Sequence, residues 1–123
     1  MNRPLNLSLQ TMRFPITAIV SILHRASGVI LFLFIPVLLC VFSCSLDSPE
    51  GFERVRALLS GPLTTFLVWG FLAALLYHLL AGLRHLVMDL GFAETLTSAK
   101  ATSLTVFILF GLGAIALGVW LWV

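Results

Sequence analysis

Three long apolar segments constrain the fold of this 123-residue chain more than any other feature; they cover residues 26–44, 63–83 and 103–123. A helix that crosses the hydrocarbon core of a bilayer needs about 20 predominantly apolar residues, so each segment is long enough to span it. An isolated strand would leave its backbone unsatisfied in lipid, and the segments lack the alternation of a membrane β-barrel. The sequence therefore predicts an all-α integral membrane protein with three transmembrane helices, at about residues 21–45, 63–87 and 103–123.

The composition excludes several other classes of protein. Hydrophobic residues make up 60% of the chain and charged residues 10%, whereas a soluble domain has about 45–50% and about 25%. The same apolar content excludes a disordered chain, and two cysteines are too few for a secreted disulfide scaffold. The formal net charge of +2 provides no dense basic patch for nucleic acid. We interpret residues 1–123 as a single membrane-anchor domain.

Lysine and arginine residues lie mostly on one side of the predicted membrane. Five on the N-terminal side face two in the first connection: Arg3, Arg13, Arg25, Arg84 and Lys100 against Arg54 and Arg56. Because cytoplasmic loops carry the excess of positive charge, this asymmetry predicts a cytoplasmic N-terminal segment, residues 1–20, and a C-terminus across the membrane.

The first connection carries a helix-start signal. Ser48 and Pro49 suit an N-cap and the first helical position, and apolar residues then recur at helical spacing up to Leu59. This pattern predicts a short amphipathic helix lying in the membrane interface.

Ionisable side chains beside the spans are functional candidates, because such groups are costly at membrane depth. His24 and Arg25 lie where the first helix enters from the cytoplasm, and Arg84 and His85 lie where the second returns to it. All four are expected at nearly the same depth, where they suit an anionic head group such as a phosphate. The alternative is that the arginines only anchor helix ends.

His78 lies inside the second span, with Gly82 and His85 on the same helix face. The space beside a glycine could take a planar ring system, which predicts haem ligation by His78; an interhelical hydrogen bond is the alternative, and spacing leaves both open. His85 is about 10 Å from His78 along the helix, and His24 is expected well away from His78 in depth. A second axial ligand would then come from another chain, in a hetero-oligomer.

Ser21 and Arg25, at i and i+4, form a polar stripe on the first helix. A hydroxyl and a guanidinium could hold a quinone head group there. The alternative is a hydroxyl bonded to its own helix beside an arginine that extends to the interface.

Three stretches of the sequence resemble one protein family closely: RPLNL at residues 3–7, SILHRASG at residues 21–28 and HLLAGLRHLVMD at residues 78–89. The similarity extends over essentially the whole chain. The chain resembles the cytochrome b membrane-anchor subunit of succinate dehydrogenase, the respiratory complex II, in its bacterial form.

The resemblance implies part of a larger hetero-oligomeric helix bundle in the bacterial inner membrane, with a periplasmic C-terminus and three partners: a flavoprotein, an iron–sulfur protein and a second membrane anchor. It implies that His78 is an axial ligand of haem b and that the second anchor supplies the other. His24 and Arg25 match residues near the haem propionates, and the role of His85 stays open. Ser21 and Arg25 match residues of the ubiquinone site.

In this family succinate oxidation belongs to the flavoprotein, so the chain is not expected to be the dehydrogenase of the tricarboxylic acid cycle by itself. Three alternatives stay open beside this prediction. One is the anchor subunit of a fumarate reductase. A second is a small transmembrane protein that relays or transports protons through its histidines and arginines, and a third is a purely structural assembly helix bundle.

Overall fold

The computed structural model describes residues 15–123, and this part of the chain forms four α-helices without a strand. They are α1 (Ile16–Asp47), α2 (Pro49–Leu59), α3 (Pro62–Asp89) and α4 (Leu96–Trp122). The three longer helices, α1, α3 and α4, are each long and apolar enough to cross a membrane, which confirms the predicted fold class. Residues 1–14, which hold Arg3, Arg13 and most of the predicted cytoplasmic segment, lie outside the described residues.

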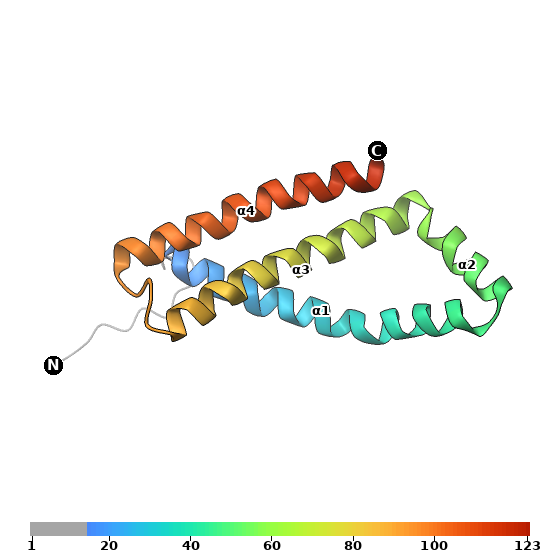
Figure 1. Ribbon diagram of the computed structural model, residues 1–123, viewed down its shortest axis with the longest axis horizontal. Coiled ribbons are helices and arrows are strands. Elements are labelled where there is room, and N and C mark those ends of the chain that lie inside the picture. Colours follow the sequence, from blue (N-terminus) through green and yellow to red (C-terminus); the bar gives the residue numbers. More distant parts are fainter. Residues whose placement is uncertain (1–14) are drawn as a thin grey trace, which may run out of the picture.

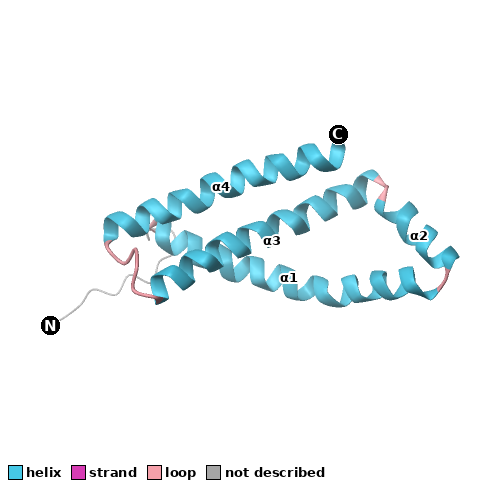
Figure 2. Ribbon diagram, in the orientation of Figure 1, coloured by secondary structure: helices cyan, strands magenta, loops and turns pink. Residues whose placement is uncertain are grey.

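The helices run back and forth along one axis, with α3 between α1 and α4 (Figure 1). The beginning of α1 and the α3–α4 connection lie at one end of the bundle, and α2 and the C-terminus lie at the other. The connections between the helices are short, as Figure 2 shows. Helices α1 and α3 extend beyond both ends of the predicted spans. Helix α4 begins before its predicted span and ends one residue short of it, at Trp122.

Side-chain hydrogen bonds at their first residues fix where α2 and α4 begin. The Ser48 side chain accepts a hydrogen bond from the Gly51 amide at 3.0 Å, and Pro49 occupies the first turn, which confirms the predicted short helix α2. A Cβ atom at Gly51 would collide with the Cys44 carbonyl group of α1, so only glycine permits this corner. At the other end of the bundle, Thr95 caps α4 by accepting from the Ser98 amide at 3.3 Å. This cap starts α4 well before the predicted span.

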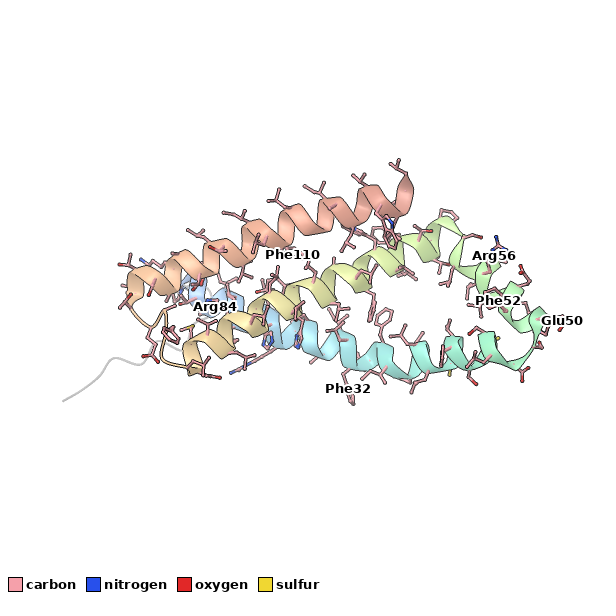
Figure 3. The ribbon with its side chains drawn as sticks, viewed as in Figure 1. Phe32, Glu50, Phe52, Arg56, Arg84 and Phe110 are labelled. Atoms are coloured by element: carbon pink, nitrogen blue, oxygen red, sulfur yellow. The ribbon has the colours of Figure 1, made fainter. Side chains whose placement is uncertain are left out.

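Tyr77 lies at the centre of the buried core and joins the three long helices. Its hydroxyl group donates to the Val20 carbonyl oxygen of α1 at 2.9 Å. Its ring packs edge-on against Phe110 of α4, with centroids 5.4 Å apart. Figure 3 shows Phe110 between α4 and α3, whereas Phe32 points away from the bundle. Phe32 is 71% exposed, as expected for a side chain that faces lipid or a partner subunit.

Candidate functional site

Two glycines let α1 and α3 approach closely, and each glycine is covered by a histidine of the other helix. A Cβ atom at Gly28 would lie 3.1 Å from Cε1 of His78, and one at Gly82 would lie 3.3 Å from Nε2 of His24. On each helix the histidine stands four residues before the glycine, so an H-x-x-x-G pattern occurs on both. The two patterns pair in antiparallel register, which places His24 opposite Gly82 and His78 opposite Gly28.

The rings of His24 and His78 stack on each other, with centroids 4.2 Å apart and planes inclined by 13°. The prediction that His24 lies well away from His78 in depth is therefore wrong. Its physical reason is the crossing itself: the absent side chains at Gly28 and Gly82 let the helices come together, and both rings fill the space over the glycines. The ring of His85 lies 5.2 Å from that of His24, so the three imidazoles form one cluster.

His78 is tied to α1 by hydrogen bonds at one ring nitrogen. Nδ1 lies 3.0 Å from Oγ of Ser27 and 3.2 Å from the carbonyl oxygen of His24. The Ser27 hydroxyl group in turn donates to that same carbonyl oxygen at 2.7 Å. Ser27 is buried while His24 and His78 are half-buried, and the three contacts together tie the His78 ring to α1.

A cavity of about 390 Å³ borders the histidine cluster. Its lining consists of the three histidines, one glycine and three leucines: His24, His78, His85, Gly82, Leu79, Leu83 and Leu86. The space expected beside Gly82 is present, but the His24 ring occupies the part directly over it. Residues 15–123 hold no group of three or more side chains placed to bind a metal ion. Three imidazole rings and three leucine side chains thus share the wall of one cavity.

A second cavity, of about 440 Å³, opens at the end of the bundle where α1 begins. It is lined by polar and apolar residues of α1, α3 and the connection that follows: Thr17, Ala18, Ser21, Arg84, His85, Met88, Asp89 and Glu94. Ser21 thus faces a polar cavity, and His85 lines both cavities. Glu94 is not a candidate from the sequence alone, because a carboxylate in a connection looks like an ordinary surface residue.

The predicted cluster of two arginines and two histidines does not form as a unit. Arg84 is buried and turns toward α4, where Nε donates to Oγ1 of Thr102 at 3.1 Å and Nη2 donates to the Ala99 carbonyl oxygen at 3.4 Å (Figure 3). Arg25 is exposed on α1 and lines neither cavity. The structure therefore brings His24 and His85 to His78, whereas Arg84 bonds to α4 and shares only the second cavity with His85.

Comparison with known proteins places the chain in a family. It matches the family described as succinate dehydrogenase/fumarate reductase transmembrane subunit over residues 1–119. It is 40% identical over 121 residues to the succinate dehydrogenase cytochrome b556 subunit of Coxiella burnetii, covering 98% of this chain and 97% of that protein. Identity to the cytochrome b556 subunit of Paracoccus denitrificans is 36% over 102 residues, covering 83% and 78%. Identity to the mitochondrial cytochrome b560 subunit of Sus scrofa is 31% over 122 residues, covering 94% and 70%.

These matches confirm the resemblance seen in the sequence and, together with the three apolar helices, make the chain a multi-pass membrane protein. The chain belongs to the succinate dehydrogenase/fumarate reductase transmembrane subunit family, among the succinate dehydrogenase cytochrome b anchor subunits.

Proposed function

We propose that this chain is the membrane-anchor subunit of a succinate:ubiquinone oxidoreductase, in which it supplies one axial ligand of haem b and part of the ubiquinone-binding site. The axial ligand is His78. The observation that carries this proposal is that His78 is bonded at Nδ1 to α1 while its ring borders a cavity walled by leucines. The relatives that bear the name succinate dehydrogenase cytochrome b subunit support the same assignment.

The hydrogen bonds of His78 suit iron ligation. The His24 carbonyl oxygen can only accept, and Oγ of Ser27 gives its own proton to that carbonyl, so Nδ1 is the donor to both oxygens. A neutral imidazole protonated at Nδ1 keeps its lone pair at Nε2, and this is the atom that binds a metal. Histidine ligands of metals generally donate their other ring N–H to a carbonyl or similar acceptor.

In this proposal His78, and not His24, is the iron ligand that this chain supplies. The His24 ring lies face to face with that of His78, so these two histidines would not both ligate the same iron. The other ligand would come from the second anchor subunit. His24, His85 and Arg25 would hold the haem propionates by charge-assisted hydrogen bonds. When bound, the haem supplies one-electron redox chemistry.

Ser21 and Arg25 form the contribution of this chain to the ubiquinone site. Ser21 lines the polar cavity, and Arg25 follows one turn later on α1. The Ser21 hydroxyl group would hold a quinone oxygen by a hydrogen bond. Arg25 would stabilise the negative charge that develops on a quinone oxygen as electrons arrive from the iron–sulfur subunit.

The partners in this proposal are a flavoprotein, an iron–sulfur subunit and a second membrane anchor, together with membrane lipids. Among the described residues, Arg25, Arg84 and Lys100 lie toward the end where α1 begins, and Arg54 and Arg56 lie on α2 at the other end. This distribution favours a cytoplasmic N-terminus and a periplasmic C-terminus in a bacterial inner membrane. The electrons would therefore enter from the cytoplasmic side.

The haem assignment is tested by His78→Ala in the purified complex. We expect the reduced b-type absorption band to be lost while the flavoprotein and iron–sulfur subunits still co-purify. Ser45→Ala is a control, because that exposed hydroxyl group bonds only to its own helix. A b-type band of native intensity in the His78 variant would reject the ligand assignment.

The quinone assignment is tested by Arg25→Ala, with Arg54→Ala on α2 as the control at the other end of the bundle. We expect succinate oxidation with an artificial electron acceptor to stay native in both. Ubiquinone reduction should fall on the order of 10²-fold in the Arg25 variant alone, because a donor that stabilises developing charge is removed. Native ubiquinone kinetics would contradict the assignment, and a complex that reduces fumarate faster than it oxidises succinate would identify a fumarate reductase anchor instead.

A further inference from the structure

We propose that Ser27 is a positioning residue for His78: its hydroxyl group fixes the Nδ1-protonated tautomer and the orientation of the imidazole, and thereby sets the reduction potential of the haem. This inference rests on the proposed ligation of haem b by His78. It concerns a residue that binds neither haem nor quinone, and that acts only through the ligand.

The Ser27 hydroxyl group has a single proton that it can donate. Ser27 is only 6% exposed, and its one proton is committed to the His24 carbonyl oxygen, 2.7 Å away. The oxygen of Ser27 is then left with lone pairs only, and it lies 3.0 Å from Nδ1 of His78. Ser27 therefore accepts from Nδ1, and its contact is shorter than the 3.2 Å between Nδ1 and the His24 carbonyl oxygen.

Three residues of α1 hold the His78 ring in place, and we call them the seat of the ring: His24, Ser27 and Gly28. Gly28 lies against Cε1 of His78, where a Cβ atom would come within 3.1 Å. The His24 ring covers a face of the imidazole at a centroid distance of 4.2 Å. One and a half turns of α1 thus supply a stacking partner, a hydrogen-bond acceptor and an open backbone surface, and they leave His78 little freedom to rotate.

The seat has a chemical consequence for a bound iron. An imidazole whose N–H group donates to a buried acceptor places more electron density on its other nitrogen. A more electron-rich axial ligand stabilises the ferric state relative to the ferrous state and so lowers the reduction potential. Loss of the Ser27 hydroxyl group should therefore raise the potential. Because the His24 carbonyl oxygen remains as a second acceptor, we expect a change no larger than the loss of one hydrogen bond gives, about tenfold in the ferrous-to-ferric ratio.

The experiment compares Ser27→Ala and Ser27→Thr in the purified complex by redox titration of the b-type band. In Ser27→Ala the ferrous state should gain about tenfold over the ferric state, which corresponds to about 59 mV for a one-electron couple. Ser27→Thr keeps the hydroxyl group and should titrate at the native potential. Ser103→Ala is the matched control, because Ser103 is also buried and its hydroxyl group also donates to a carbonyl oxygen of its own helix, that of Ala99 at 2.8 Å.

Each result decides the question. A native potential in Ser27→Ala, or an equal shift in Ser27→Thr, would overturn the inference. If Ser27→Ala cannot retain haem while Ser27→Thr does, the hydroxyl group is needed and the inference is supported; loss of haem from both would overturn it. The His78→Ala complex separates a failure of the proposed haem ligation from a failure of the proposed role of Ser27. A native b-type band there rejects the ligand assignment itself, whereas its loss beside a Ser27→Ala complex that behaves like Ser103→Ala rejects only the role of Ser27.

Discussion

Replacing Gly28 with alanine tests whether the close approach of α1 and α3 is what seats His78. The added Cβ atom would lie 3.1 Å from Cε1 of His78 and 3.7 Å from Nδ1. This distance is tighter than ordinary van der Waals contact, so the ring would have to retreat by a few tenths of an ångström. The substitution therefore acts on the seat of the ring without touching a side chain that bonds to it.

The cost follows from three contributions. Extra volume in a packed site costs about 1–3 kcal/mol. Retreat of the ring strains the two contacts of Nδ1, now 3.0 and 3.2 Å, and each interhelical hydrogen bond in a membrane is worth about 0.6 kcal/mol. The higher helix propensity of alanine offsets about 0.5–1 kcal/mol. The net loss is about 2 kcal/mol, or about 30-fold in the retention of a group bound by His78.

The assay is the haem content of the purified complex and the rate at which haem passes to an excess of apomyoglobin. Gly70→Ala on α3 is the control, because a Cβ atom there meets none of the described atoms within 4 Å. We expect faster haem loss in Gly28→Ala and native behaviour in Gly70→Ala. Haem loss at the native rate in Gly28→Ala would show that the close approach of α1 and α3 does not hold His78 in place, and so would equal haem loss in both variants.

Two further predictions concern the packing of the helices. Tyr77→Phe should cost only about 0.6 kcal/mol in detergent unfolding of the complex, because the Val20 carbonyl group keeps its partner within α1, whereas Tyr77→Ala should cost about 3–5 kcal/mol through lost ring packing. Equal losses would contradict this division between hydroxyl group and ring. Arg84→Met should weaken the contact of α3 with α4 by about 1 kcal/mol, since the hydrogen bonds to Thr102 and its helix are lost. Ubiquinone reduction should persist in the assembled Arg84 variant, and its disappearance there would show that Arg84 acts on the substrate.

The helices can be predicted from the sequence because lipid leaves the backbone few choices. Long apolar segments must be helical in a membrane, and the Ser48–Pro49 signal for α2 is purely local. The start of α4 is harder to foresee. Half or more of residues 95–102 are polar and resemble a connection, yet the Thr95 side chain caps a helix that begins at Leu96. A span defined by hydropathy is therefore shorter than the helix that contains it; here the helix begins at Leu96 and the predicted span at residue 103.

The candidate site can be predicted only in part, because its geometry depends on the register between helices. The pairing of His78 with Gly82 is visible along one helix, but the contact of His78 with Gly28 requires knowledge of how α1 lies against α3. The stacking on His24 depends on the same register. Arg84 differs again: its position at the end of a span suggests the lipid interface, and its partners on α4 are invisible in the sequence of α3 alone.

The leucines beside the histidine cluster indicate how the site must be completed. Leu79 directly follows His78, and Leu83 and Leu86 come after Leu79 at one-turn intervals along α3; the three leucines are 56%, 50% and 60% exposed. They wall the cavity that His78 borders, yet half or more of each side chain stays uncovered. A haem needs apolar contacts on both of its faces, whereas α1 and α3 present one histidine seat and one apolar stripe. Under the proposed haem ligation, this chain would supply His78 and the leucine stripe, and a partner subunit packed along that stripe would complete the enclosure.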